Sequence, residues 1–137
     1  MSKPIAPTTG IAFAFPDVCL TPAPPSSPIP IPYPNIAQLG QATGISDESE
    51  KELLVGGMHV LLLESEVANS SGDEAGSSGG VKSGTIMGKC VVKQASNSVL
   101  YGPDGKGIAR FMDMTEQNDG NAVGNIMAAF PTVLVGD

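Results

Sequence analysis

Several residue types that carry chemistry in other proteins are scarce in this chain. Tryptophan is absent, histidine occurs once, and two tyrosines and four phenylalanines are the only aromatic residues among 137. Seven basic residues, of which only Arg110 is an arginine, stand against fourteen acids, for a net charge of −7. Nucleic-acid binding depends largely on basic residues that neutralise phosphates, so the composition argues against such a partner. It also argues against stable attachment to an anionic membrane surface.

Long apolar runs are missing as well. The first segment, MSKPIAPTTGIAFAFP, is interrupted by prolines, and its apolar run covers only residues 11–15. A signal peptide needs a longer apolar centre, and a membrane-spanning helix needs about 20 apolar residues. We therefore expect a protein without a signal peptide that is made and kept in the cytoplasm. Cys19 and Cys90 could form one disulfide or none, and two cysteines are too few for a disulfide scaffold.

Glycine and proline are abundant instead, with 17 and 12 residues. Together they exceed the roughly 12% of average proteins. Because aromatic residues are few, the core must come from Ile, Val, Leu, Met and Ala. Many short strands joined by tight turns suit this composition better than a helical bundle. The length suits one domain, so we expect a single, mainly β domain.

Eight of the prolines lie in one stretch, residues 15–37, with the sequence FPDVCLTPAPPSSPIPIPYPNIA. Proline fixes φ and lacks a backbone N–H, so the stretch can form neither a helix interior nor a central strand. Its prolines alternate with Ile29, Ile31 and Tyr33, which predicts a stiff extended ribbon whose large apolar side chains, together with Ile36, are buried. A disordered proline-rich linker or ligand segment is the alternative interpretation.

Helical elements are expected to be few and short. Residues 35–44 predict a turn or a short helix. Residues 46–54, SDESEKELL, are the best helix candidate, because Ser46 or Asp47 can act as N-cap and early acids suit the positive end of the helix dipole. The glycine pair at residues 56–57 ends this helix.

Strands are expected over much of the remaining chain. Residues 58–66 and 85–95 predict two strands, the second with a bulge at Gly88. Residues 99–112 predict a hairpin around a Pro-Asp-Gly turn. The other expected segments are a loose tail at residues 1–10, a first strand at 11–15 that ends at Pro16, a loop at 69–84, a turn at 118–120, and a last apolar element at 125–134 that Pro131 breaks.

No pattern of residues predicts catalysis. The segment GTIMGKC at residues 84–90 is one residue short of a phosphate-binding loop and lies in a predicted strand. His59 is the only base available for a Ser/His/Asp arrangement, and in an apolar strand a structural role is more common. Cys19, His59 and Cys90 are weak candidates for a tetrahedral zinc site, but the close ligand pairs typical of such sites are absent. We expect no cofactor, with zinc as the disfavoured alternative.

Three segments, taken together, resemble a known family. FPDVC-x-TP followed by PIPYPNIA, then SSGDEAGSSGGVKSG, then GKGIARFMDMTEQNDGN, are similar in sequence and order to the PAAR-like family. These are small spike-tip proteins of type VI secretion and related contractile injection systems. The residues that match the family motifs are Phe15, Pro16, Asp17, Cys19, Pro32, Tyr33, Pro34, Asn35, Gly72, Asp73, Glu74, Arg110, Asp113, Met114, Thr115 and Asn118.

The resemblance covers nearly the whole chain and implies a compact, cone-shaped β fold of short strands with pseudo-threefold character. In this family the broad base sits on a trimeric β-helical spike and the apex points at the target membrane. Residues 11–137 would then form a single PAAR-like domain without a C-terminal toxin domain. The proline-rich stretch would be a strap that wraps a small β core.

The chain departs from the family at the apex. In PAAR proteins the apex is commonly held by zinc with histidine and cysteine ligands, and PAAR-like members often show a pattern resembling R-H-x-D-M-T-x-H-N-H-G. Cys19 matches the family's cysteine, but Phe111, Gln117 and Asp119 stand where the pattern has histidines. These three residues are our apex candidates, and we expect Phe111 to fill the apex by apolar packing in place of metal.

The resemblance implies a non-enzymatic spike-tip protein that caps and sharpens the trimeric spike, aids membrane puncture and helps to load an effector. The expected partners are a homotrimeric β-helical spike protein, at one tip per trimer, and an effector cargo, with transient contact to the target membrane. The protein is expected in the cytoplasm during assembly and is then expelled at the tip of the apparatus. The alternative is a small β-rich adaptor or binding module for a secreted toxin, outside any spike.

Overall fold

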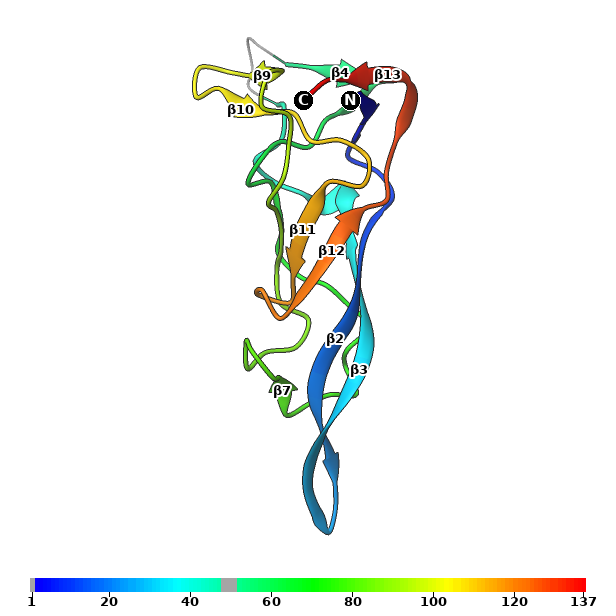
Figure 1. Ribbon diagram of the computed structural model, residues 1–137, viewed down its shortest axis with the longest axis vertical. Coiled ribbons are helices and arrows are strands. Elements are labelled where there is room, and N and C mark those ends of the chain that lie inside the picture. The colour runs from blue at the N-terminus through cyan, green and yellow to red at the C-terminus, as the bar shows by residue number, and fades with distance from the viewer. Residues whose placement is uncertain (1, 48–51) are drawn as a thin grey trace.

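A computed structural model describes residues 2–47 and 52–137. The molecule is an elongated cone that tapers from a broad end, where both termini lie, to a narrow end formed by one hairpin (Figure 1). The elements are β1 (Lys3–Ile5), β2 (Ile11–Ala23), β3 (Ser26–Gln38), the 3-10 helix η1 (Leu39–Gln41), β4 (Leu54–Val55), β5 (Met58–His59), β6 (Glu66–Val67), β7 (Gly79–Gly80), β8 (Cys90–Val92), β9 (Leu100–Tyr101), β10 (Lys106–Gly107), β11 (Met114–Gln117), β12 (Ala122–Ile126) and β13 (Phe130–Val135). The predicted mainly β, cone-shaped fold with at most one or two short helices is confirmed.

The central sheet has the strand order β3-β2-β12-β11-β8-β6, with β7 paired to β2 beside this path. The strand pairs of this sheet are antiparallel. The β2–β3 hairpin is its longest part and continues alone to the narrow end (Figure 1). No helix in the described ranges has the length and apolar character needed to cross a membrane.

The proline-rich stretch forms this hairpin, and β3 is an edge strand of the sheet. The carbonyls of Val18 and Leu20 accept hydrogen bonds from the far side of β2, so the backbone of Cys19 faces β3 and pairs with Ile31. Backbone groups alternate in direction along a strand, so the prolines on either side of Ile31 point their nitrogens outward. The prolines of β3 therefore remove donors only from its outer edge, where none is needed. The expectation that the stretch forms no central strand is wrong for its first part, because β2 lies between β3 and β12; Pro16 falls in the register shift between Ala14 and Asp17.

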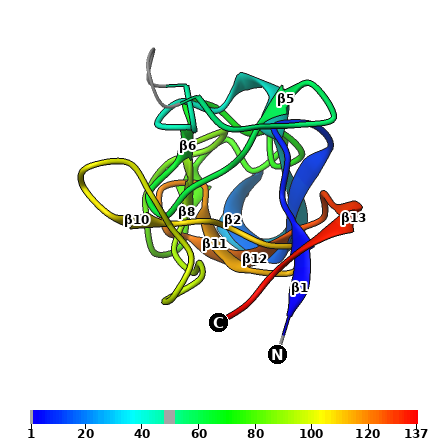
Figure 2. The same cartoon turned by 90° about the horizontal axis from the view of Figure 1, so that it is seen from above.

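Three two-stranded ribbons surround the axis at the broad end, β1–β13, β4–β5 and β9–β10 (Figures 1 and 2). The third corresponds to the hairpin predicted at residues 99–112. The first is closed by strands from the two ends of the chain. Each ribbon is antiparallel and pairs one leucine with the residue opposite: Leu134 with Pro4, Leu54 with His59, and Leu100 with Gly107.

Each ribbon continues into a segment that meets the other two, and these segments are residues 4–8, 59–63 and 107–111. Their backbones form a closed ring of hydrogen bonds, in which the N–H of Ala6 donates to Ala109, that of Ala109 to Leu61, and that of Leu61 to Ala6, at N···O distances of 2.9–3.1 Å. All three side chains are fully buried. We call these three residues the central ring.

A second ring of backbone hydrogen bonds joins the same three segments, with donor and acceptor running in the opposite sense. The N–H groups two residues past the central ring donate to carbonyls two residues before it: Thr8 to His59, Leu63 to Gly107, and Phe111 to Pro4. Three isolated β-bridges also pair a residue next to the central ring with one in the adjacent segment: Pro7 with Val60, Leu62 with Ile108, and Arg110 with Ile5. The base therefore has pseudo-threefold symmetry built from one chain, which confirms the expected pseudo-threefold character.

Two apolar clusters form the core. One lies under the ribbons and contains the buried residues Ile5, Val55, Val60, Leu62, Ile108 and Val135, with Tyr101 of β9 packed against it. The other lies inside the central sheet and includes Leu39, Leu61, Cys90 and Ile126. At about 25 cal/mol per Å² of buried apolar area, such clusters supply the main favourable term in folding.

Several predicted elements differ in the structure. The tail expected at residues 1–10 contains β1, and Ile5 is only 3% exposed, because β1 completes a ribbon with β13. The strand expected to end at Pro16 continues as β2 to Ala23, with a register shift between Ala14 and Asp17. The burial expected for the strap is wrong: Ile29 is 45% exposed, because the hairpin projects beyond the sheet, and Ile31, Tyr33 and Ile36 are only half-buried.

The other differences concern element length. The strand expected at residues 58–66 is limited to β5, since the chain then enters the rings; the strand expected at 85–95 is limited to β8, and residues 85–89 form a loop. The helix predicted at residues 46–54 falls partly on 48–51, outside the described residues, and its described remainder is not helical. The Pro-Asp-Gly hairpin and the turn at 118–120 are confirmed.

Candidate functional site

A buried polar cluster lies in the tapering half of the molecule, where β7 meets β2. Its centre is the Asp17 carboxylate on β2, which is fully buried. Asn118 and Asn121, from the β11–β12 turn, donate side-chain hydrogen bonds to Asp17 Oδ1 at 3.2 and 2.5 Å. Asn35 on β3 donates to Oδ2 at 3.1 Å. The cluster therefore ties together three segments that are far apart in the sequence.

Asp73 and Cys19 complete the polar cluster. The backbone N–H of Met87 donates to Asp73 Oδ1 at 3.0 Å, and Asn35 donates to Oδ2 at 3.4 Å. The Cys19 thiol lies 3.5 Å from Asp17 Oδ1 and donates to it. One ligand-type atom each from Asp17, Cys19 and Asp73 lies within 4.8 Å of the others.

Glycines allow this close approach. A Cβ on Gly76 would collide with the Cβ of Cys19 and touch the Tyr33 ring, and a Cβ on Gly80 would collide with the Asn121 side chain. The Gly-Ser loop at residues 69–84 can lie against β2 only because these positions lack side chains.

The two carboxyl groups of the cluster have different pKa values. Burial opposes ionisation of Asp17, but hydrogen bonds from Asp73, Asn121, Asn118 and Cys19 outweigh it and lower its pKa. Burial, followed by the hydrogen bond to Asp17 and its charge, raises the pKa of Asp73 to about 7. Asp73 therefore carries the proton, and Asp17 carries the charge. Burial and the nearby Asp17 raise the pKa of the Cys19 thiol to about 12, so it stays protonated.

A second buried polar group lies near the chain termini and contains opposite charges. Arg110, only 4% exposed, donates from Nε and Nη2 to the two oxygens of Asp113, at 3.1 and 3.2 Å. Lys3 Nζ lies 2.7 Å from Asp113 Oδ1, and Arg110 Nη1 lies 3.1 Å from Asp137 Oδ1. The hydrogen bonds that Arg110 donates to Asp113 raise the pKa of Arg110 further, so the guanidinium stays charged.

The residues that match the family motifs are thus divided between two places. Asp17, Cys19, Asn35, Asp73 and Asn118 meet in the polar cluster, whereas Arg110 and Asp113 meet near the termini. The others have supporting or exposed positions: Tyr33 hydrogen-bonds Thr21, Glu74 accepts from the Gly72 N–H, Pro34 lies against Gly72, Thr115 hydrogen-bonds Gln117, and Phe15, Pro16, Pro32 and Met114 are exposed.

The structure places none of the three apex candidates at the narrow end. Phe111 belongs to the second backbone ring, near the broad end. Gln117 is buried within the sheet and donates to Asn35 Oδ1 at 2.8 Å. Asp119 is exposed in the β11–β12 turn and accepts from Thr85. The narrow end is formed instead by the strap, around Pro24 and Pro25 (Figure 1).

Ser70 and Asn121 are members of the polar cluster that sequence reasoning missed. Ser70 Oγ accepts from Asn35 at 2.9 Å and donates to the Gly88 carbonyl at 2.7 Å. Asn121 directly follows the Asn-Asp-Gly turn, so the sequence alone predicts only a turn residue at this position. The available signal was that two asparagines, Asn118 and Asn121, flank the same turn, so that both side chains can reach one neighbouring group.

The donor set does not fit zinc. Of the three weak candidates, His59 lies at the broad end against Glu52, and Cys90 lies in the apolar core. Cys19 alone reaches the polar cluster, where its neighbours are two carboxyls and asparagine nitrogens. Zinc in proteins takes thiolate, imidazole and carboxylate ligands, so the thiol and the two carboxyls are of a suitable kind. Three amide N–H groups already donate to Asp17, however, and no histidine joins the cluster. Both cysteines are free and buried, in different clusters, so they form no disulfide.

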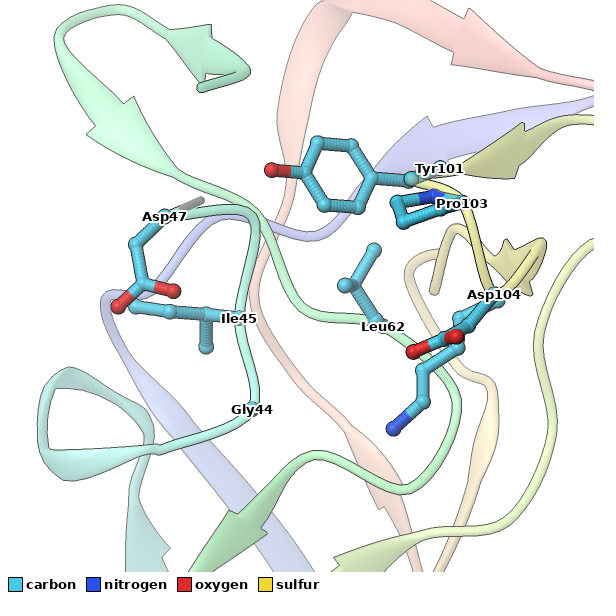
Figure 3. A pocket seen from close by; sticks show the side chains of 9 residues that line it. Gly44, Ile45, Asp47, Leu62, Tyr101, Pro103 and Asp104 are labelled. Carbon is cyan, nitrogen blue, oxygen red and sulfur yellow. The ribbon is translucent and has the colours of Figure 1, made fainter. Parts of the chain in front are cut away.

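A surface hollow at the broad end lies between residues 44–47 and the β9–β10 hairpin (Figure 3). Its volume is about 180 Å³, and its wall contains Leu62, Tyr101, Asp47 and Asp104. Sites for small organic ligands are typically about 300–1,000 Å³, so this hollow is small for such a ligand. Its two carboxylates, Asp47 and Asp104, are exposed to solvent.

Comparison with known proteins identifies the fold family. No curated protein and no solved structure matches the chain. The model of the toxin PAAR-like domain family, Tox-PAAR-like, matches residues 10–124. This range contains the strap, the polar cluster and two of the three ribbons. Because the match covers most of the length, the chain belongs to the toxin PAAR-like domain family.

Proposed function

We propose that this protein is a non-enzymatic tip that caps and sharpens the trimeric spike of a contractile, type VI-like injection system. Family membership supports a role associated with spikes and effectors. The observation that carries the finer proposal is the pseudo-threefold base, in which one chain repeats the same backbone pairing three times. A cap with this base can offer one equivalent contact to each subunit of a trimer.

The three ribbons also share a side-chain pattern. In each, an exposed leucine precedes a residue that faces the apolar cluster below: Leu54-Val55, Leu100-Tyr101 and Leu134-Val135. The leucines are 46%, 54% and 61% exposed, respectively. Exposed apolar side chains that recur with the symmetry of the base are suited to burial against a threefold partner. We propose that the blunt end of the spike covers them.

The proposal also covers assembly, loading and expulsion of the tip. The protein assembles with its spike in the cytoplasm, helps to load an effector, and is expelled with the spike. The narrow hairpin then makes transient contact with the target membrane. The alternating prolines suit this role, because they restrict the hairpin before it folds and limit the conformations open to it.

Co-expression with candidate trimeric spike proteins tests the proposal. We expect a complex of one tip and three spike subunits by native mass spectrometry. A triple variant, Leu54→Asp, Leu100→Asp and Leu134→Asp, should lose the complex. The matched control is Phe15→Asp, Val123→Asp and Met127→Asp, at residues on or directly after strands of the central sheet that are 57%, 58% and 47% exposed, and it should keep the complex. Failure of the wild-type protein to bind any spike from the same genome, or equal loss in both triple variants, would refute the proposal.

The second candidate function is an adaptor for a secreted toxin. It is favoured by the exposed apolar residues on the side of the central sheet, among them Phe13, Phe15 and Val123. The same variants separate the two functions. An adaptor outside any spike should lose its toxin in the Phe15, Val123 and Met127 variant and should bind no spike in any form.

A further inference from the structure

We infer that the tapering half of this protein is held together by a metal-free hydrogen-bond network centred on Asp17, at the cysteine that matches the family's metal ligand. The inference rests on the direction in which three asparagine side chains point. It does not depend on what the broad end binds.

The amide group of Asn118 is held in one orientation from both sides. Its oxygen accepts hydrogen bonds from the backbone N–H of Gly88 at 2.9 Å and from the Thr85 hydroxyl at 3.2 Å. Its nitrogen donates to the Thr85 carbonyl at 2.8 Å and to Asp17 at 3.2 Å. Reversal would place an N–H against the Gly88 N–H and an oxygen against a carbonyl, so the nitrogen must face Asp17.

Asn121 is held in the same way. Its oxygen accepts from the backbone N–H groups of Lys82 and Ser83, at 2.8 and 3.2 Å. Its nitrogen donates to the Val18 carbonyl at 3.0 Å and to Asp17. Two backbone donors and one backbone carbonyl therefore determine which atom of this amide reaches the carboxylate.

Asn35 approaches Asp17 from the other side. Its oxygen accepts from Gln117, and its nitrogen donates to Ser70 as well as to the two carboxyl groups of the cluster. Gln117 is itself fully buried, and its oxygen accepts from the Thr115 hydroxyl at 2.8 Å. The chain of donors and acceptors that orients Asn35 therefore continues into the central sheet.

A cation at this place would meet hydrogen atoms. Asp17 receives three amide N–H groups and the Cys19 S–H, so the partial charges that surround its oxygens are positive. Calcium and magnesium require about six or more oxygen ligands. All three amide oxygens are turned away toward other donors, so the side chains of the cluster leave only the carboxyl oxygens of Asp17 and Asp73 for a cation. Zinc would require the thiolate of Cys19, which lies beside a carboxylate and among N–H donors. No buried side-chain N or O atom in the described residues lacks a hydrogen-bond partner.

The inference is tested by metal content and by the state of the amides. Protein expressed with added zinc and then washed with chelator should contain zinc far below the one ion per chain of a structural site. Its thermal unfolding, followed by circular dichroism, should be the same with and without chelator. About one zinc per chain after washing, or a lower Tm with chelator, would overturn the inference.

Two further measurements test the network, one on the wild-type protein and one on a conservative variant. In NMR spectra of the wild-type protein, the side-chain amide protons of Asn35, Asn118 and Asn121 should exchange slowly with solvent, whereas those of the exposed Asn97 should exchange fast. Cys19→Ser retains a donor for Asp17 and should keep both the zinc content and the Tm of the wild type. Fast exchange at all four asparagines, or a zinc content that falls on replacement of Cys19, would contradict the network.

Discussion

The two ends of this molecule bury charge by different means. Near the termini, Arg110 and Lys3 neutralise Asp113, so the buried charges are of opposite sign. In the tapering half, the two buried acids Asp17 and Asp73 have no basic side chain among their described contacts. Neutral amides stabilise the charge of Asp17, and a retained proton keeps Asp73 neutral. The first arrangement depends on complete ion pairing. The second depends on where a proton resides, and it therefore responds to pH.

The largest effect is expected from Asp113→Ala. This change leaves the buried guanidinium of Arg110 without its main partner, and breaking a buried ion pair costs about 3–5 kcal/mol. The free energy of unfolding, measured by urea denaturation with circular dichroism, should fall by this amount. Asp137→Ala is the control, because its carboxylate contacts the same guanidinium but its side chain is 69% exposed. A loss at Asp113 no larger than that at Asp137 would show that the pair does not hold this end together.

The pH dependence distinguishes the tapering half. Folding raises the pKa of Asp73 from 3.8 to about 7, so the folded protein keeps a proton that the unfolded chain loses in this range. The free energy of unfolding should therefore fall as pH rises from 3.8 to about 7, by up to ~1.4 kcal/mol per pH unit. Below this range the sign reverses, because Asp17 has a lowered pKa and its stabilising contribution is lost on protonation.

Urea unfolding at a series of pH values measures this dependence. The other titratable group that faces the two carboxyls is Cys19, which stays protonated throughout the range because its pKa is raised to about 12. Asp73→Asn should flatten the profile between pH 3.8 and about 7, whereas Asp113→Ala should lower it without changing its shape there. Identical profiles for the wild type and Asp73→Asn would mean that Asp73 does not hold the proton.

A smaller effect is expected from the strap. Pro30→Ala should reduce the free energy of unfolding by about 0.4–1 kcal/mol, because the unfolded chain gains freedom. The change also places a backbone N–H on the outer edge of β3, so we expect measurable self-association by light scattering. Pro103→Ala, in the β9–β10 turn, should have the same effect on stability without self-association. If both variants self-associate, the new N–H on the edge of β3 is not the cause of association.

The sequence predicts local geometry well and long-range pairing poorly. The strap and the Pro-Asp-Gly hairpin follow from prolines and glycines that act on their own neighbours. The central ring does not, because Ala6, Leu61 and Ala109 share no motif and their relation exists only as backbone hydrogen bonds. The loose tail predicted at residues 1–10 is wrong for the same reason, since the partner of β1 lies at the other end of the chain.

The candidate site shows the same division. The family motifs lead to Asp17, Cys19, Asn35, Asp73 and Asn118, and these do meet. Their pattern does not reveal that the asparagines present nitrogen rather than oxygen, because this is decided by backbone donors at Lys82, Ser83 and Gly88. Nor does the pattern show that Phe111 lies near the base. Phe111 was expected at the apex, but the strap forms the narrow end instead.

The ring of Ala6, Leu61 and Ala109 has a consequence for how the protein would meet a symmetric partner. One chain supplies all three units, so their backbones match while their side chains differ. On a true trimer the molecule could then settle in three rotational positions of similar energy. This multiplicity alone would favour binding by about 0.6 kcal/mol, and averaging over the three positions would blur the tip in any image that imposes the symmetry of the spike.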